Sequence, residues 1–561
     1  MKGSAPRFAA AFVAACLIST PVWAAPAVTT TGPAAPTPGQ VQATLPTQTP
    51  EPKQVPAPLS QAPVTPSGVS PGGPSFKVTG FVIEGNTVIP TDELQAQIAG
   101  YVGQSLTLAQ LYDVADVLTR YYRAKGYGLA DVAPPAQKIT DGSVRLQVIE
   151  GRVGKISIQG NTRTHEVVLQ KRVSGLHSGD IYTDAAAERA VLLLNDLPGV
   201  GARAVLSPGQ EFGSSDMLFN VDESHYNGDV SIDDYGRSVI GRWRISADVY
   251  DNSFTGNGDQ LSAGVTHADG NRLNFGKLAY ALPVGPDGGT LTSSYNRAEY
   301  HGLFSNGTGG TLPFSGSTQN AGLNWQYPEL RSTDRNLYWS MGLNWDNSRS
   351  LSSGINALTT NIMLLQIGTF YTRSFQDQSS LTSSFTFWTN GKHYVHGQSL
   401  NNVSAERARG EWDNTYQLPF AGNWTFIGQL NLTYSVNALT DADKFNLGGP
   451  GSVLGYQSAE QRGDSGYFGS TEVERAFSWG PYWPMVWGVF LDTGKVWDKA
   501  GTVATTGTDS SRGISSGGLD LQLLPSADKI NARLQWAYSI GRKPTDSDRG
   551  GHIWFSLGTS F

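Results

Sequence analysis

The sequence predicts two small α+β units followed by a sixteen-stranded antiparallel β-barrel that crosses a membrane. Two patterns carry this prediction: a β-α-α-β-β order that occurs twice between residues 75 and 225, and an alternation of apolar and polar residues that runs from residue 226 to the end. Composition agrees, because only 16% of the 561 residues are charged, against roughly 25% in typical soluble domains. The mean hydropathy is nevertheless slightly negative, at -0.26.

Residues 1–25 have the pattern of a secretory signal peptide. Lys2 and Arg7 precede an apolar core from Phe8 to Ile18, and small residues follow. Cys16, the one cysteine, lies inside this segment. "VAAC" also resembles a bacterial lipoprotein cleavage box, in which Cys16 would carry lipid. On the signal-peptide interpretation the mature chain has no cysteine, which excludes disulfides and thiolate metal sites.

Residues 26–74 form a proline-rich linker. Thirteen of the thirty prolines lie between Ala25 and Pro74, and the charged residues there are Glu51 and Lys53. Such a composition predicts an extended, mobile tether that buries no core and holds no helix.

The first α+β unit is expected over residues 75–151. A strand-rich run from Phe76 leads to a helix that starts with Thr91 as its cap, and a second helix and two strands follow. The second helix carries one apolar stripe, made of Leu108, Leu111, Val114, Ala115, Leu118 and Tyr122. The second unit, residues 152–225, repeats the order, and "IQGNTRT" at 158–164 aligns with "IEGNTVI" at 83–89.

From residue 226 onward the chain predicts membrane strands. In "NWTFIGQLNLTYSV", residues 423–436, one set of alternate positions is almost wholly apolar and the other almost wholly polar. A long apolar face must be covered by another layer or by lipid, and no helical pattern remains to cover it. Lipid offers no partner to an open sheet edge, so we expect closure into a barrel rather than the alternative, a soluble β-sandwich. The strands are expected to begin near residues 228, 241, 258, 270, 288, 315, 333, 359, 378, 404, 422, 467, 485, 514, 529 and 551.

The connections between these strands alternate in length. Short ones, such as residues 283–289, 328–335, 419–423 and 525–529, suit the periplasmic side of an outer membrane, and longer polar ones suit the outside. An even strand number then returns the C-terminus to the side of the α+β units.

The sequence patterns typical of other classes of protein are absent here or lack the surrounding structure that their function needs. No apolar run after the first 25 residues approaches the roughly 18 that a membrane helix needs, and the net charge of -7 gives no nucleic-acid footprint. "GISSG" at 513–517 precedes a strand instead of the helix of a nucleophile elbow. His393 and His396 have no evident third metal ligand, and "RGD" at 462–464 is interpreted as coincidence. We therefore expect no catalytic residues, metal or cofactor.

The whole arrangement resembles the two-partner secretion transporters, the haemolysin secretion and activation family within the superfamily of barrels that carry POTRA domains. In that family a long loop, here about residues 438–466, folds back into the barrel lumen. Its tip motif is matched by Val453, Gly455 and Tyr456, with Leu454 in place of the family's arginine. A second motif on a wall strand is matched by Phe490, Asp492 and Gly494.

The motif aspartate normally pairs with the missing arginine. A carboxylate that faces a barrel interior needs a donor, so Arg462 or lumen water is expected to serve Asp492. At the C-terminus, Phe561 ends a strand that looks like the signal read by the barrel-assembly machinery.

The resemblance implies a transporter in the outer membrane of a Gram-negative bacterium, with its POTRA domains in the periplasm. Its partner would be a large secreted exoprotein with an N-terminal β-helical secretion domain, which crosses unfolded. A barrel-assembly factor is the main alternative, and a passive porin is a third. The family often plugs its pore with an N-terminal helix, against which the proline content of the linker argues here.

Overall fold

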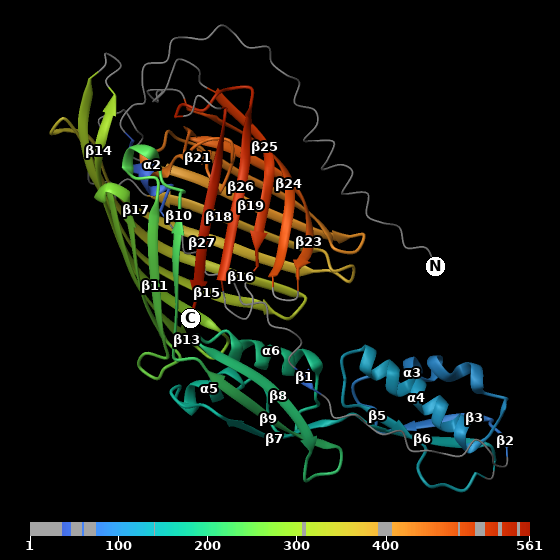
Figure 1. Cartoon of the computed structure of the whole chain (residues 1–561). Helices are drawn as coiled ribbons and strands as arrows, with labels where there is room; N and C mark the ends of the chain where they lie inside the picture. The colour runs from blue at the N-terminus through green and yellow to red at the C-terminus, as the bar shows by residue number, and fades with distance from the viewer. Residues whose placement is uncertain are drawn as a thin grey trace.

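The computed structural model describes residues 36–45, 59–60, 75–139, 141–305, 310–390, 407–480, 483–499, 511–524, 530–546 and 550–561. The predicted signal peptide, Cys16, His393 and His396 lie outside these ranges. A barrel of long strands forms one end of the molecule, and two α+β units extend from the opposite end (Figure 1). No described helix has the length and apolar content needed to span a membrane.

The first unit packs two helices on a small sheet of order β3-β6-β5. Its core includes Leu111, Val114, Leu118 and Tyr122, as the helical stripe predicts. Leu108, at the start of the second helix, is instead 53% exposed, so its place in the stripe is wrong. The elements are β2 (Phe76–Lys77), β3 (Gly80–Glu84), α3 (Thr91–Ile98), η1 (Ala99–Tyr101), β4 (Ser105–Leu106), α4 (Leu108–Ala124), β5 (Asp131–Ala133) and β6 (Ser143–Ile149).

The predicted cap of α3 is also corrected. Pro90 occupies the N-cap position and makes no side-chain cap. The Thr91 hydroxyl instead accepts a hydrogen bond from Asn86 Nδ2 at 3.0 Å, so it is engaged with the preceding turn and does not cap the helix.

The second unit repeats this architecture in the order β-α-α-β-β. Its sheet has the order β1-β8-β9-β7, in which β8, β9 and β7 correspond to β5, β6 and β3 of the first unit. The additional strand β1 comes from the proline-rich linker. The elements are β1 (Leu59–Ser60), β7 (Arg152–Gln159), α5 (Glu166–Arg172), α6 (Asp184–Asn195), β8 (Val200–Pro208) and β9 (Ser214–Glu223).

The aligned Gly-Asn-Thr sequences form the same turn in both units. Gly85 and Gly160 have positive φ values of 90° and 94°, a conformation that glycine adopts without steric cost. Asn86 Nδ2 donates to the carbonyl of Ile89 and Asn161 Nδ2 to that of Thr164, each at 2.9 Å. The internal repeat therefore extends to individual hydrogen bonds.

A glutamate at the end of the sheet holds each turn. Glu150 accepts the Thr87 backbone N–H at 2.5 Å, and Glu223 accepts the Thr162 backbone N–H at 2.7 Å. Burial raises the pKa of Glu223, but hydrogen bonds from the turn outweigh it and lower the pKa to about 2. Each unit thus relies on an ionised carboxylate to fix its turn.

The barrel prediction is confirmed: sixteen antiparallel strands among the described residues close into a cylinder, with β10 paired to β27 from Asp229–Ser560 to Asp233–Ser556. The strands are β10 (Tyr226–Asp233), β11 (Arg244–Asn252), β12 (Gln260–Ala268), β13 (Leu273–Val284), β14 (Gly289–Ser305), β15 (Thr311–Arg331), β16 (Arg335–Ser352), β17 (Ile355–Ser374), β18 (Ser380–Asn390), β19 (Arg407–Phe420), β20 (Trp424–Ser435), β23 (Ser465–Trp479), β24 (Trp483–Trp497), β25 (Ser511–Leu523), β26 (Ile530–Ile540) and β27 (Gly551–Ser560). "GISSG" lies within β25 and forms no nucleophile elbow.

The two faces of each strand differ as the alternation predicts. On β26, Trp536 and Tyr538 are 53% and 56% exposed, whereas Gln535 and Ser539 on the other face are 2% and 6% exposed. The apolar face therefore points outward to lipid and the polar face into the lumen.

The second unit is tied to the barrel end that carries the short turns. Arg331 Nη2 contacts Asp196 Oδ1 at 2.7 Å, and Arg163 Nη1 contacts Asp251 Oδ1 at 2.6 Å. The Arg331 side chain is only 2% exposed. These contacts define the periplasmic end, so the longer connections lie at the cell surface.

Candidate functional site

The barrel lumen holds two segments of the chain. One is the connection between β20 and β23, residues 436–464, here called the lumen loop, which contains η4 (Asp441–Asp443), β21 (Phe445–Leu447) and β22 (Gln461–Gly463). The other is α2 (Pro38–Gln42), from the proline-rich linker. Figure 1 shows α2 and β21 toward the surface end of the barrel, and Gly39 of α2 is hydrogen-bonded to Asp441 of η4.

Helix α2 corrects the prediction that the linker holds no helix. Pro38 takes the first helical turn, where its missing N–H costs nothing, and Thr37 and Gln40 form a capping box. Val41 is 0% exposed and packs against the inner wall beside Phe275 and Tyr300. Tertiary contacts thus support a helix of five residues, which would be marginal alone.

The tip motif of the lumen loop is buried against the wall. Val453 and Tyr456 are both 0% exposed and share an apolar cluster with Phe468 and Val496. The Tyr456 hydroxyl donates to the carbonyl of Arg542 at 2.6 Å. An ideal Cβ at Gly455 would lie 2.6 Å from Ser516 Cβ, so the tip approaches the wall too closely for a side chain there.

Leu454, which stands where the family has arginine, is anchored through its backbone. Its N–H donates to Asp492 Oδ2 at 3.2 Å, and its carbonyl accepts from Trp554 Nε1 at 2.7 Å. Its side chain joins an apolar cluster with Phe490 and Trp554. Wall side chains therefore hold both polar groups of the residue without an ion pair.

Asp492 is 4% exposed and is served by neutral donors. Besides the Leu454 N–H it accepts the hydroxyls of Ser470 at 2.7 Å and Ser516 at 3.3 Å. No salt bridge to Asp492 is formed within the described ranges, so the expectation that Arg462 replaces the motif arginine is wrong. Gly494, two residues on, faces Leu447 of the lumen loop.

Arg462 instead joins the two lumen segments. It contacts Asp441 Oδ1 at 2.6 Å, Thr37 Oγ1 at 2.6 Å and Asn446 Oδ1 at 2.7 Å. Asp441 Oδ2 in turn accepts the N–H of Gly39 in α2 at 2.8 Å. The Arg462–Asp441 pair, here called the latch, thus binds α2 to the lumen loop at a site where both side chains are under 10% exposed.

Further ion pairs fix the base of the lumen loop. Arg407 contacts Asp443 Oδ2 at 2.8 Å, and Lys444 contacts Asp498 Oδ1 at 3.1 Å. Arg512 also contacts Asp498, at 2.8 Å. Loop residues of both signs therefore meet complementary charges of the wall and of the surface connection after β24.

Arg237 is a loop anchor that the sequence analysis missed. It lies in the surface connection between β10 and β11, donates to the carbonyl of Ser458, and is 7% exposed. Burial lowers its pKa to about 10, which the nearby Glu460 carboxylate opposes. No motif marks this residue, whereas the Thr-Pro-x-Gln order at 37–40 matches a capping box and offered a signal for α2.

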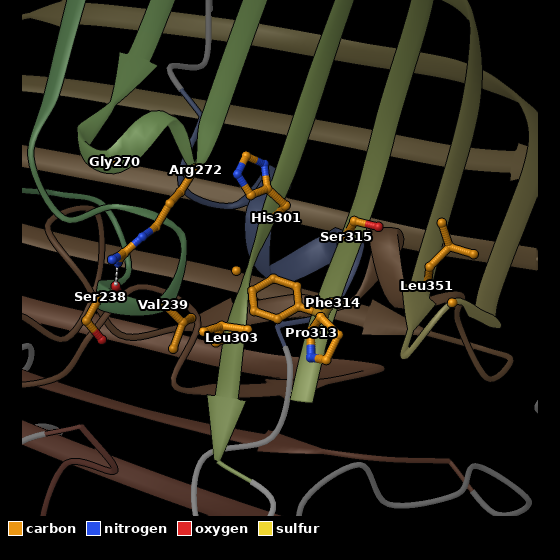
Figure 2. Close-up of a pocket in the computed structure, with 12 residues that line it drawn as sticks. Ser238, Val239, Gly270, Arg272, His301, Leu303, Pro313, Phe314, Ser315 and Leu351 are labelled. Carbon is orange, nitrogen blue, oxygen red and sulfur yellow. Dashed lines mark hydrogen bonds between the residues drawn. The ribbon is translucent and has the colours of Figure 1, made fainter. Parts of the chain in front are cut away.

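Two other features lie nearby. Glu472, Glu474 and Asp520 bring three carboxylates together on the inner wall, but Arg533 pairs with Asp520, so a cation of the chain already occupies part of this cluster. A pocket of about 610 Å³ lies at the surface end, lined by η2 (Ser238–Ile240) and residues of β14 and β15. Figure 2 shows Phe314 among the lining side chains and the Arg272 guanidinium hydrogen-bonded to the Ser238 carbonyl, at 3.0 Å.

Comparisons with known proteins agree with this architecture. The family described as haemolysin secretion/activation protein ShlB/FhaC/HecB matches residues 213–519, and the ShlB-type POTRA domain matches residues 76–151. The heme/hemopexin transporter protein HuxB of Haemophilus influenzae is 26% identical over 414 residues, 69% of this chain and 70% of that protein. The outer membrane transporter CdiB of Dickeya dadantii is 22% identical and covers 72% of both.

Two solved structures share the fold. CdiB from Escherichia coli superposes with a TM-score of 0.70 at 19% identity, over 93% of this chain and 95% of that one. A form of BamA from Haemophilus ducreyi that lacks POTRA domains 1–3 gives a TM-score of 0.52 at 15% identity, over 87% of this chain and all of that one. The chain therefore belongs to the haemolysin secretion/activation family of ShlB, FhaC and HecB, with a POTRA domain at its N-terminal side and a barrel in the outer membrane.

Proposed function

We infer that the protein is the outer-membrane transporter of a two-partner secretion system, which moves a large exoprotein from the periplasm to the cell surface. The observation that carries this is a closed barrel of the secretion family whose lumen holds two segments of the chain, attached through hydrogen bonds, ion pairs and apolar contacts. A passive porin needs a lumen free for small solutes, and it has no use for two α+β units docked at the periplasmic end.

The lumen segments must move before a polypeptide can pass. α2 rests on one small apolar cluster, the latch and a few hydrogen bonds. The lumen loop is held by the hydrogen bond of the Tyr456 hydroxyl, by the backbone hydrogen bonds of Leu454, and by ion pairs such as that between Arg407 and Asp443. Each contact is exchangeable with water or with a passing chain, so the contents are suited to reversible displacement.

The tip and wall motifs would set the resting position of the loop. Val453 and Tyr456 supply the buried contacts, Gly455 permits the close approach, and Asp492 receives the Leu454 N–H. Phe490 packs on Leu454, and Gly494 leaves room for Leu447. We propose that these residues stabilise the resting position of the lumen loop. We also propose that Arg462 holds α2 in the lumen and does not pair with Asp492.

The repeated Gly-Asn-Thr turn supports the second α+β unit as a second POTRA domain. Recognition of the exoprotein would fall to these periplasmic units, through pairing of an extended segment of the exoprotein with a sheet edge, since such pairing reads backbone and is weak enough to release the client. Following the family resemblance, the exoprotein would enter unfolded and fold outside into a β-helix, which disfavours return.

Phe561 has a structural place that fits an assembly signal. Its N–H donates to the carbonyl of Gly228 at 2.9 Å, and its carbonyl accepts from the Gly228 N–H at 3.2 Å, across the seam between the first and last strands. We propose that the barrel-assembly machinery reads this terminal strand before it pairs with β10.

Deletion of the gene, with and without a plasmid copy, tests the function. We expect one large protein to vanish from the medium or cell surface of the deletion strain and to return with the plasmid, while other outer-membrane proteins keep their abundance. A general fall in outer-membrane barrels would instead support the alternative, an assembly factor. An unchanged set of surface and medium proteins would refute secretion.

A further inference from the structure

The outer edge of β8 is covered by a piece of the linker. β1 runs parallel to β8, with Leu59 opposite Ala204 and Ser60 opposite Val205. Since β9 pairs with the other side of β8, β1 takes the backbone groups that would otherwise face solvent. An edge strand with free amide and carbonyl groups is a template for another extended chain. Here β1 already pairs with part of that edge.

Two other edges of the α+β units are blunted, and β8 is not. In the first unit the corresponding strand, β5, has three residues and is followed by Pro134 and Pro135. Beyond them the side-chain amide of Gln137 pairs with both backbone groups of Arg145, at 2.8 Å each. That edge therefore offers no run of free groups.

The edge of β7 is interrupted as well. Its pairing with β9 shifts register between Val153 and Ile156, and its first residue bridges Ile181. By contrast β8 is nine residues long, pairs with β9 without a shift, and has proline only at its last position. Of these three edges, β8 alone has the regular geometry that strand addition needs. The remaining edge strand, β3, has five residues against the nine of β8.

The surroundings of β8 allow access from the periplasm. Val205 is 40% exposed, and the Arg203 side chain, paired with Asp222, is 76% exposed. β1 covers only two of the nine positions. A longer extended segment could form more hydrogen bonds along β8 than β1 does, and would displace it.

From these observations we propose that the outer edge of β8 is the docking edge for an extended segment of the exoprotein, and that residues 59–60 occupy it at rest as an intramolecular competitor. The proposal rests on the proposed secretion function and names the strand at which recognition takes place. The competitor is weak by its length, so it would exclude short, non-specific segments while it yields to a client that pairs along the whole strand.

A reversible cross-link tests this in the intact transporter. Ser60→Cys with Val205→Cys places two thiols on directly paired residues, whose strands lie about 4.8 Å apart, within the roughly 4.4–6.8 Å between Cα atoms that a disulfide spans. Cys16 is the only other cysteine. The oxidising periplasm favours the bond, and Val205→Cys alone is the matched control.

We expect the disulfide to form and to lower export of the exoprotein about tenfold or more, because affinity falls with the fraction of edge that is open. A membrane-permeant reductant should restore export. Conversely, Leu59→Pro with Ser60→Pro, which removes both backbone donors of β1, should raise photo-crosslinking of the exoprotein to a probe at position 205 about two- to fivefold, since less competitor remains. A probe at Lys155 on β7 should give little product.

Three results overturn the proposal while secretion itself stands: full disulfide formation with unchanged export, absence of the disulfide in a barrel that is assembled, or equal cross-linking at positions 155 and 205. If the unmodified protein exports nothing, the proposed function fails instead. The exoprotein used is the one that disappears from the medium of the deletion strain.

Discussion

A methyl group at Gly39 tests whether α2 blocks the lumen. In a free helix Gly→Ala is stabilising by roughly 0.5–1 kcal/mol, so propensity alone predicts a better plug. In the lumen, however, an ideal Cβ at Gly39 would lie well inside the contact distance of Arg462 Nη2 and of the Asp441 carbonyl. The side chain of Arg462 can move, whereas the carbonyl of Asp441 belongs to the backbone of η4.

Relief of this clash requires α2 to shift away from η4, which breaks the hydrogen bond from the Gly39 N–H to Asp441 Oδ2 at 2.8 Å. A hydrogen bond to a charged group contributes about 1.5–3 kcal/mol. At about 1.4 kcal/mol per factor of ten, Gly39→Ala should shift the docking equilibrium of α2 toward release by roughly ten- to a hundredfold. The gain in helix propensity and the clash have opposite effects on the docking of α2, and the structure predicts that the clash is the larger.

Conductance of the purified protein in a planar bilayer measures this shift. We expect Gly39→Ala to open far more often than the wild type. Gly451→Ala is the matched control, because a Cβ there meets nothing within 4 Å and the residue lies in the lumen loop, against which α2 packs. Conductance equal to that of the wild type, or a rise of the same size in Gly451→Ala, would show that α2 does not govern the lumen.

Three further predictions concern the loop anchors and the periplasmic turn. Asp492→Ala leaves the buried N–H of Leu454 without its acceptor, a cost of about 1–3 kcal/mol. We expect it to lower export more than Asp492→Asn does, while the folded barrel, detected by its heat-modifiable migration on gels, stays abundant. Equal losses of export in the two variants would mean that the charge of Asp492 itself matters. Tyr456→Phe removes the hydrogen bond to Arg542 and should weaken gating, seen as more frequent openings, whereas loss of the barrel would make Tyr456 structural. Glu223, with its pKa lowered from 4.5 to about 2, stabilises the second unit fully above about pH 4.5 and loses this effect as the pH falls toward 2; hydrogen exchange of the turn should accelerate over that window in the wild type, but not in Glu223→Gln.

The barrel could be predicted from sequence because its signal is local and repeated. Alternation with a period of two is imposed on every strand by lipid on one side and water on the other. The expected starting positions therefore fall within four residues of the strands in the structure, from β10 at Tyr226 to β27 at Gly551. The repeat of the α+β units was equally visible, since aligned turns use the same residues.

The contents of the lumen were harder to predict because they depend on contacts between distant segments. α2 has five residues and a proline-rich context, and it is held by Asp441 and Arg462, some four hundred positions away. Since that helix was not expected, Arg462 was left to serve Asp492. The short strand β1 was not predicted either, because a strand of two residues carries no periodic pattern.

The lumen loop is fastened at the surface end of the barrel: Arg237 grips it from one outer connection, and the carbonyl of Arg542 receives Tyr456 from another. A molecule that binds these two surface connections from outside, such as an antibody or a phage tail fibre, would therefore stabilise or displace the lumen loop without entering the barrel. Export could thus be regulated by ligands outside the cell.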